Sequence, residues 1–248
     1  MIRLSSAKCE EIKKEVAKLY SKYGLSELPI RSIELAKQMG IKVIPYSQIP
    51  DEKRYLFMKK SSDGFCVQFE NKKWCIFYND EIKSKERINN TIMHEIGHIT
   101  LKHSEDSELA EKEVKFFAKY ALAPPVLIHA LNISKVEDIV KTFCVSNEAA
   151  KYALEYYEKW LRLLKTKVFK GKTSVKNYEK IILFLFKNHK RSDLPPNMTQ
   201  NKQLRAEQCA NTKTTRSRQT ICKLHTNYVT KSTIYNIKIQ LDKFGTIR

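Results

Sequence analysis

Residues 91–98 read TIMHEIGH, and this stretch decides which fold to expect around it. His94 and His98 are four residues apart, and a helix brings such residues to one face. Two imidazole nitrogens on one face can reach a single metal ion, and Glu95 lies at the edge of that face. The spacing therefore predicts a helix that carries two metal ligands and a neighbouring carboxylate.

The chemistry that this pattern serves is metal-assisted hydrolysis of a peptide bond. A catalytic zinc site has three protein ligands and leaves the fourth position to water. Bound zinc lowers the pKa of water to about 7, and Glu95 is then the expected general base and the later acid for the leaving amine. The alternative for the bare motif is a solvated helix face that carries two histidines, and a third ligand separates the two interpretations.

The third ligand is expected near the start of the next helix, which the apolar pattern places at residues 107–122. The side chains in reach are His103, Glu105, Asp106, Glu108, Glu111 and Glu113. The buried side of this helix is defined by Leu109, Val114, Phe116, Phe117 and Leu122. Glu113 lies one turn from Phe117, whereas the pattern groups Glu111 with the solvated charges. The prediction is therefore a zinc site made by His94, His98 and Glu113.

The first 165 residues or so predict an α+β fold that is mostly helical with a small antiparallel sheet. Helices are expected at 6–23, 32–40, 84–102, 107–122, 126–131, 135–143 and 147–166. A strand is expected at 41–45, and Phe65–Phe69 and Trp74–Tyr78 are expected to form a hairpin with Trp74–Tyr78 at the edge of the sheet. Gly97 inside the metal-binding helix costs about 1 kcal/mol, so we expect close packing there.

Four segments resemble the ImmA/IrrE metallopeptidases, which have a reduced zincin core. They are IFYND at 76–80, ERINNTIMHEIGH at 86–98, EVKFFAKYALAPP at 113–125 and VSNEAAKYALEYYEKW at 145–160. The resemblance implies that the carboxylate that opens the E-x-x-x-F-A segment, here Glu113, completes the zinc site. The chain departs from the family pattern at Val114 and Lys115, where alanine and asparagine or aspartate are commoner.

The resemblance also implies a biological role. Family members are intracellular regulatory proteases that cleave or inactivate a helix-turn-helix repressor, often encoded beside them on phages and mobile elements. The chemistry of the residues alone predicts only a zinc-dependent peptide-bond hydrolase. A third interpretation is a HExxH scaffold that sequesters the repressor without cleaving it.

Two further residues are candidates for a role near the site. HEIGHITLKH differs from the metzincin pattern because the internal glycine is missing and the last histidine comes one residue early. His103 is therefore expected to support the ligands or the fold rather than to bind metal. Zincins bind an extended peptide along an edge strand, so Tyr78 is expected either beside the substrate or in the core. His129, among apolar neighbours, is expected to be a packing residue.

Charge divides the chain into a predicted metallopeptidase domain at 1–166 and a basic, poorly ordered extension at 167–248. Residues 161–248 have 20 Lys and Arg against 4 Asp and Glu, a net charge of +16. This tail could contact nucleic acid, but it has no recognisable reader motif, and Cys209, Cys222 and His225 lack the fourth ligand of a zinc finger. We therefore favour a solvated or accessory tail over a DNA-binding arm.

The expected location is the cytoplasm. The N-terminal residues MIRLSSAKCEEIKKEV lack the apolar core of a secretion signal, and the six cysteines form no CxxC pair, which indicates reduced thiols. The apolar run at 181–186 is far shorter than the roughly 20 residues that cross a bilayer. No contact with a membrane is expected.

Overall fold

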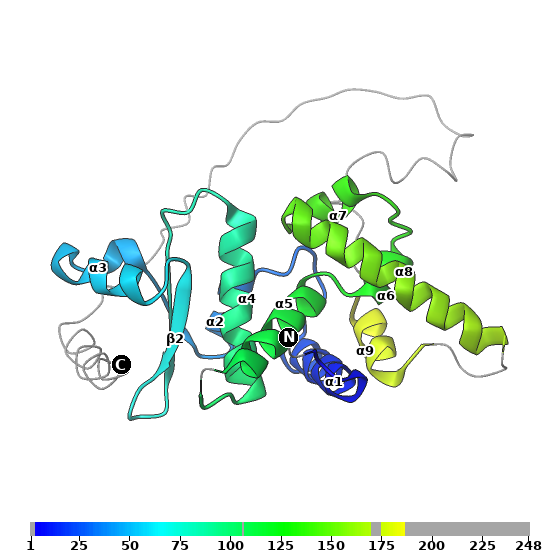
Figure 1. The fold of residues 1–248 in the computed structure, drawn as a ribbon, viewed down its shortest axis with the longest axis horizontal. Coiled ribbons are helices and arrows are strands. Elements are labelled where there is room, and N and C mark those ends of the chain that lie inside the picture. Colours follow the sequence, from blue (N-terminus) through cyan, green and yellow to red (C-terminus); the bar gives the residue numbers. More distant parts are fainter. Residues whose placement is uncertain (1–2, 106, 170–174, 187–248) are drawn as a thin grey trace, which may run out of the picture.

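The computed structural model describes residues 3–105, 107–169 and 175–186 (Figure 1). Most of the predicted basic extension lies outside these ranges. The elements in chain order are α1 (Ser6–Tyr23), α2 (Ser32–Gln38), β1 (Lys42–Pro45), the 3-10 helix η1 (Tyr46–Gln48), α3 (Asp51–Lys60), β2 (Gly64–Gln68), β3 (Trp74–Tyr78), α4 (Lys85–Leu101), α5 (Glu108–Leu122), α6 (Pro125–Ala130), α7 (Val136–Phe143), α8 (Asn147–Phe169) and α9 (Asn177–Phe186). The predicted α+β class, mostly helical with a small sheet, is confirmed.

The sheet has three strands in the order β1-β3-β2. The hairpin β2–β3 is antiparallel as predicted, but β1 pairs with β3 in parallel, so the sheet is mixed. The prediction that Trp74–Tyr78 is an edge strand is therefore wrong, because this strand has a partner on each side. A turn of a few residues indicates a hairpin in the sequence, whereas pairing with a distant parallel strand depends on the tertiary fold.

The two faces of the sheet have separate cores. One face packs against α4 and α2 and belongs to the main core of the protein. The other face is covered by η1 and α3, and Figure 1 shows α3 on the side of β2 away from α4. The second core consists of Ile44, Tyr46, Ile49, Phe57, Phe65, Val67, Cys75 and Phe77. The sheet is thus fully sandwiched, and its α4 face is the one beside the candidate site.

Helices α4 and α5 pack closely at the centre of the molecule. Gly97 on α4 is buried, and a Cβ built on it would lie 3.1 Å from Phe117 Cδ1 and 3.3 Å from Val114 Cβ on α5. The two helices approach this closely because position 97 has no side chain. The close packing expected at Gly97 is present.

The N-termini of these two helices are fixed by serine caps. The hydroxyl of Ser84 accepts a hydrogen bond from Arg87 N at 3.1 Å, and the hydroxyl of Ser107 accepts one from Ala110 N, also at 3.1 Å. Each cap satisfies one backbone donor that the first turn leaves without a helical partner. The start of α5, where the candidate ligands lie, is thereby defined.

Helix α9 belongs to the same folded body as α1. Tyr178 and Ile182 are buried in the main core, and α9 packs against α1 and α6. A group of charged and phenolic side chains, here called the Glu10 cluster, joins the two helices. It consists of Glu10, Lys13, Lys176 and Tyr178. The predicted boundary at residue 166 falls within α8, and the packed elements continue past it.

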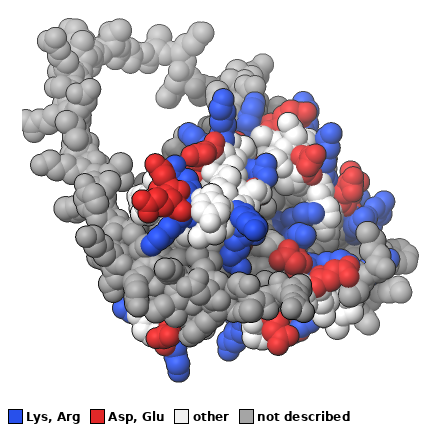
Figure 2. Space-filling model, turned by 60° about the vertical axis from the view of Figure 1, so that its left-hand side comes forward, with Lys and Arg blue, Asp and Glu red and all other residues white. Residues whose placement is uncertain are grey.

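The described surface carries charges of both signs. Figure 2 shows one side of the molecule, on which lysine and arginine side chains are interspersed with aspartate and glutamate. Among the described residues, no helix has the length and hydrophobicity of a membrane span.

Candidate metal centre

The first two side chains of the site come from one face of α4. The Nε2 atoms of His94 and His98 lie 3.3 Å apart. Both side chains are largely buried, with 18% and 12% of their surface exposed. The helical spacing thus brings the two imidazoles together as the sequence predicts.

A third side chain arrives from the first turn of α5. Glu111 Oε1 lies 3.3 Å from His98 Nε2, and its Oε2 lies 3.6 Å from His94 Nε2. Among the described residues, these three form the group of ligating side chains that could hold a metal ion, with their donor atoms within 4.8 Å of one another. A tetrahedral zinc ion with bonds of about 2.0–2.1 Å separates its ligand atoms by about 3.3–3.4 Å. The donor set and its spacing therefore fit zinc.

Glu113, the ligand predicted from the sequence, lies elsewhere. Its Oε2 is 3.1 Å from His103 Nε2, and its Oε1 is 3.8 Å from the Nζ of Lys8 on α1. Residues two apart on a helix point about 200° apart around its axis, so Glu111 and Glu113 cannot serve the same ion equally. The geometry assigns the third position to Glu111 and not to Glu113.

The solvated character of Glu111 explains why the sequence pattern favoured Glu113 as the third ligand. The Glu111 side chain is 41% exposed, and its Oε2 lies 3.5 Å from Lys115 Nζ one turn later. This is the i,i+4 ion pair that usually marks a solvated helix face. A metal site that is open to substrate lies near the protein surface, so the partial exposure of Glu111 is compatible with a role as ligand.

The electrostatics of the group favour neutral imidazole and ionised carboxylate. Burial lowers the pKa of His94, and this effect outweighs the charge of Glu111, which raises it. Burial raises the pKa of Glu111, but the neighbouring His94, His98 and Lys115 together lower it below its usual value. Metal ligands must be deprotonated, so both shifts favour the binding form.

Glu95, the predicted catalytic base, lies on α4 next to this group without joining it. Only 7% of Glu95 is exposed. Burial raises the pKa of Tyr46, which lies between the sheet and α3, and the charge of Glu95 raises it further.

The other predicted residues occupy distinct places. His103 Nδ1 lies 3.3 Å from His98 Nδ1, so His103 contacts His98 at the ring nitrogen that does not face His94 and Glu111. Tyr78 is half-buried at the end of the central strand, opposite Gly64 of β2 and Pro45 of β1. It is not on an edge strand, which was the basis for expecting it beside a substrate.

His129 packs against neighbouring side chains as predicted, but it does so at the surface. It is exposed, and its Nδ1 lies 3.1 Å from the hydroxyl of Tyr157. Its ring also lies near that of Trp160, with 5.5 Å between the ring centroids. His129 thus joins α6 to α8 at the surface, and it is not part of the group formed by His94, His98 and Glu111.

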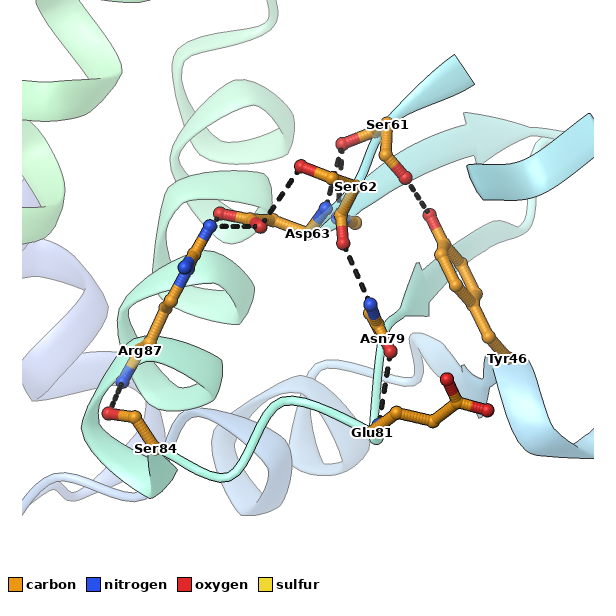
Figure 3. Close-up of polar contacts among 9 residues, drawn as sticks. Tyr46, Ser61, Ser62, Asp63, Asn79, Glu81, Ser84 and Arg87 are labelled. Atoms are coloured by element: carbon orange, nitrogen blue, oxygen red, sulfur yellow. Dashed lines mark hydrogen bonds and ion pairs between the residues drawn. The ribbon is translucent and has the colours of Figure 1, made fainter. Parts of the chain in front are cut away.

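A polar network that the sequence did not reveal ties the sheet to α4 (Figure 3). Arg87 on α4 donates from Nε and Nη2 to the two carboxylate oxygens of Asp63, at 3.1 and 2.7 Å. Asn79, which is buried, donates from Nδ2 to the carbonyl of Ser62 at 3.0 Å and from its backbone N–H to the carbonyl of Asp63 at 2.8 Å. The start of β2 is therefore fixed relative to α4.

Gly64 allows this close approach. A Cβ built on Gly64 would lie 2.9 Å from Thr91 Cγ2 on α4 and 2.7 Å from the carbonyl oxygen of Phe77. Any side chain at this position would push β2 away from the helix that carries His94 and His98. The sequence signal for this contact is a glycine immediately before the predicted strand Phe65–Phe69.

A mostly helical α+β fold in which a HExxH helix meets a glutamate of the next helix is the arrangement of a metallopeptidase. Residues 36–155 match the family model described as the IrrE N-terminal-like domain, a peptidase family. This match supports an ImmA/IrrE-type metallopeptidase domain in this region of the chain. No curated protein matches the chain. Helices α1 and α9 lie outside the matched region.

Proposed function

We propose that this protein is a cytoplasmic, zinc-dependent endopeptidase of regulatory type. The observation that carries the proposal is the convergence of His94, His98 and Glu111 from two helices, with separations that suit a tetrahedral zinc ion. Zinc, when bound, supplies a Lewis acid that polarises the scissile carbonyl and makes water a better nucleophile.

The roles of the protein side chains follow from their places. His94, His98 and Glu111 hold the ion and leave its remaining position to the reactants. Glu95 receives the proton of the attacking water and passes it to the amine nitrogen that leaves when the C–N bond breaks. Its position one residue after His94 on the same helix supports this role.

We place the substrate along β2. Of the two edge strands, β2 packs against α4, whereas β1 packs against α2. An extended peptide that pairs with the outer side of β2 would add a fourth strand next to the metal-binding helix. The Asp63–Arg87 pair and Gly64 keep this strand close to α4.

The proposed substrate class is a helix-turn-helix transcriptional repressor of a phage or mobile element. The support is the resemblance to the ImmA/IrrE proteases and the family match over residues 36–155. A repressor that is cleaved cannot return to its operator, so a single turnover suffices for an irreversible switch.

The test is cleavage of candidate repressors by the full-length, zinc-loaded protein. Repressors encoded by genes neighbouring that of this protein are incubated with wild type and with Glu95→Gln, and new N-termini are identified by mass spectrometry. We expect specific cleavage by wild type, and a loss of about 100-fold or more in Glu95→Gln with zinc content unchanged. Repressor inactivation that is equally strong with Glu95→Gln would instead show sequestration.

A further inference from the structure

Behind the metal centre, three side chains form a continuous line of contacts. Glu113 Oε2 lies 3.1 Å from His103 Nε2, and His103 Nδ1 lies 3.3 Å from His98 Nδ1. The nitrogen of His98 at the other side of the ring, Nε2, is the one that faces His94 and Glu111. The line Glu113–His103–His98 therefore ends at the candidate metal position.

The line is shielded from water. The side chains of His103 and Glu113 are 14% and 9% exposed. Lys8 of α1 adds a positive charge 3.8 Å from the second oxygen of Glu113. Helix α1 lies outside the region that matches the family model, so this contact comes from a part of the chain that the match does not cover.

Each contact of this line has a donor and an acceptor, and only one assignment of these roles leaves His98 able to bind a metal ion. An ionised carboxylate only accepts, so His103 must donate its Nε2–H to Glu113. A neutral imidazole that is protonated at Nε2 has a lone pair at Nδ1, so His103 accepts from His98 Nδ1–H. His98 with its proton on Nδ1 has its lone pair on Nε2, which is the nitrogen turned to His94 and Glu111. In the reverse direction the proton would occupy the metal-facing nitrogen.

We propose that Glu113 and His103 form a relay that fixes the tautomer and the ring orientation of His98 for metal binding. Both are positioning residues that act through His98, and neither touches the metal. Ligand histidines commonly donate their other ring N–H directly to a carboxylate or carbonyl, and here a second imidazole is interposed between ligand and carboxylate. The inference rests on the metal site of the proposed function.

The test compares zinc affinity and the state of the His98 ring in the full-length protein. The variants are Glu113→Gln, His103→Phe and the double variant, with Glu108→Gln and His129→Phe as matched controls. Glu108 is an exposed glutamate on the same helix, paired with Lys112. Zinc dissociation constants are measured by competition with a chromophoric chelator, and nitrogen-15 NMR follows the His98 Nδ1 proton of the zinc-loaded protein.

We expect each single variant to bind zinc about 10–100-fold more weakly, with both controls close to wild type. Because the two residues act in series, the double variant should be no weaker than the weaker single variant. The Nδ1 proton of His98 should be observable in wild type and lost to exchange with water in His103→Phe. Thermal unfolding in EDTA checks that each metal-free variant is folded. If His103→Phe fails to fold, Glu113→Gln at nearly equal volume decides the outcome.

Two results would overturn the relay: zinc affinities within about 2-fold of wild type in folded variants, or additive losses in the double variant. Either is distinct from failure of the proposed function. A wild-type protein that binds no zinc refutes the metal site itself, and one that binds zinc without cleaving any repressor leaves the relay intact.

Discussion

The metal centre and the Glu10 cluster are both partly buried groups of charged residues between helices. They differ in the balance of hydrogen-bond donors and acceptors among their side chains. In the Glu10 cluster, Glu10 accepts from Lys13 Nζ at 2.9 Å, from Tyr178 Oη at 2.8 Å and from Lys176 Nζ. Each donor there has an acceptor. In the metal centre, ring nitrogens of His94 and His98 and a carboxylate oxygen of Glu111, all atoms that can bind a metal ion, lie within 4.8 Å of one another.

This difference separates a structural cluster from a binding site. A carboxylate that receives several hydrogen bonds has its charge largely satisfied within the protein. Two imidazole nitrogens without a proton and a carboxylate repel one another at these distances unless a cation lies between them. The pattern of donors and acceptors, rather than the amount of buried charge, therefore marks the functional site.

The largest expected effect concerns zinc-dependent stability. At a free zinc concentration 1,000 times its dissociation constant, binding stabilises a folded protein by about 4 kcal/mol. We expect Glu111→Ala to remove most of this gain, because only two ligands remain, and Glu10→Gln to keep it. The measurement is the melting temperature with zinc and with EDTA. A full zinc shift in Glu111→Ala would show that another group completes the site.

The second prediction concerns the stability of the fold, independent of zinc binding. Glu179 is 2% exposed and accepts from Trp160 Nε1 at 2.7 Å and from Lys176 N at 2.9 Å. Replacing it with alanine leaves two donors without this acceptor, so we expect Glu179→Ala to lower the free energy of unfolding by about 1–3 kcal/mol. Urea unfolding measures this loss, and zinc affinity should be unchanged. A parallel loss of zinc affinity would mean that the two regions are coupled.

A smaller effect is expected where α4 and α5 meet. Gly97→Ala adds a methyl group 3.1 Å from Phe117 Cδ1, and overpacking of this kind costs about 1–3 kcal/mol against a gain of about 1 kcal/mol in helix propensity. We expect a small net loss of stability and weaker zinc binding, since α5 carries Glu111. Val114→Ala should partly rescue Gly97→Ala by opening space. Additive destabilisation in the double variant would exclude this clash as the cause.

The smallest effect is the pH dependence of the Glu10 cluster. Burial raises the pKa of Glu10, but hydrogen bonds from Lys176, Lys13 and Tyr178 outweigh it and lower the pKa to about 2. A carboxyl whose folded pKa is lowered stabilises the protein above its unfolded pKa of 4.5 and loses this contribution as pH falls toward 2.

The comparison of wild type with Glu10→Gln tests this dependence. At neutral pH, we expect wild type to be more stable by up to about 1 kcal/mol, because the cluster is partly solvated. The difference should shrink as pH falls below about 5. Melting temperatures from pH 7 to pH 3 measure it, and a constant difference would show that Glu10 is not the titrating group.

Local pattern determined much of the fold. The helix at 6–23, with the left-handed Gly24 after it, follows from apolar spacing and a glycine stop, and α1 has these bounds. The pairing of His94 and His98 follows from the same rule, because residues four apart on a helix are neighbours whatever surrounds them. The hairpin β2–β3 also needs only local information.

Tertiary structure alone decided which carboxylate meets the histidines and which strand is the edge. Glu111 and Glu113 are chemically identical and both lie on α5, so only the way in which α5 packs against α4 at Gly97 determines which one faces His94 and His98. β3 is the central strand because β1 pairs with it, although η1, α3 and β2 separate these two strands in the sequence. Contacts between distant segments depend on how whole elements pack, and no spacing within one element encodes that packing.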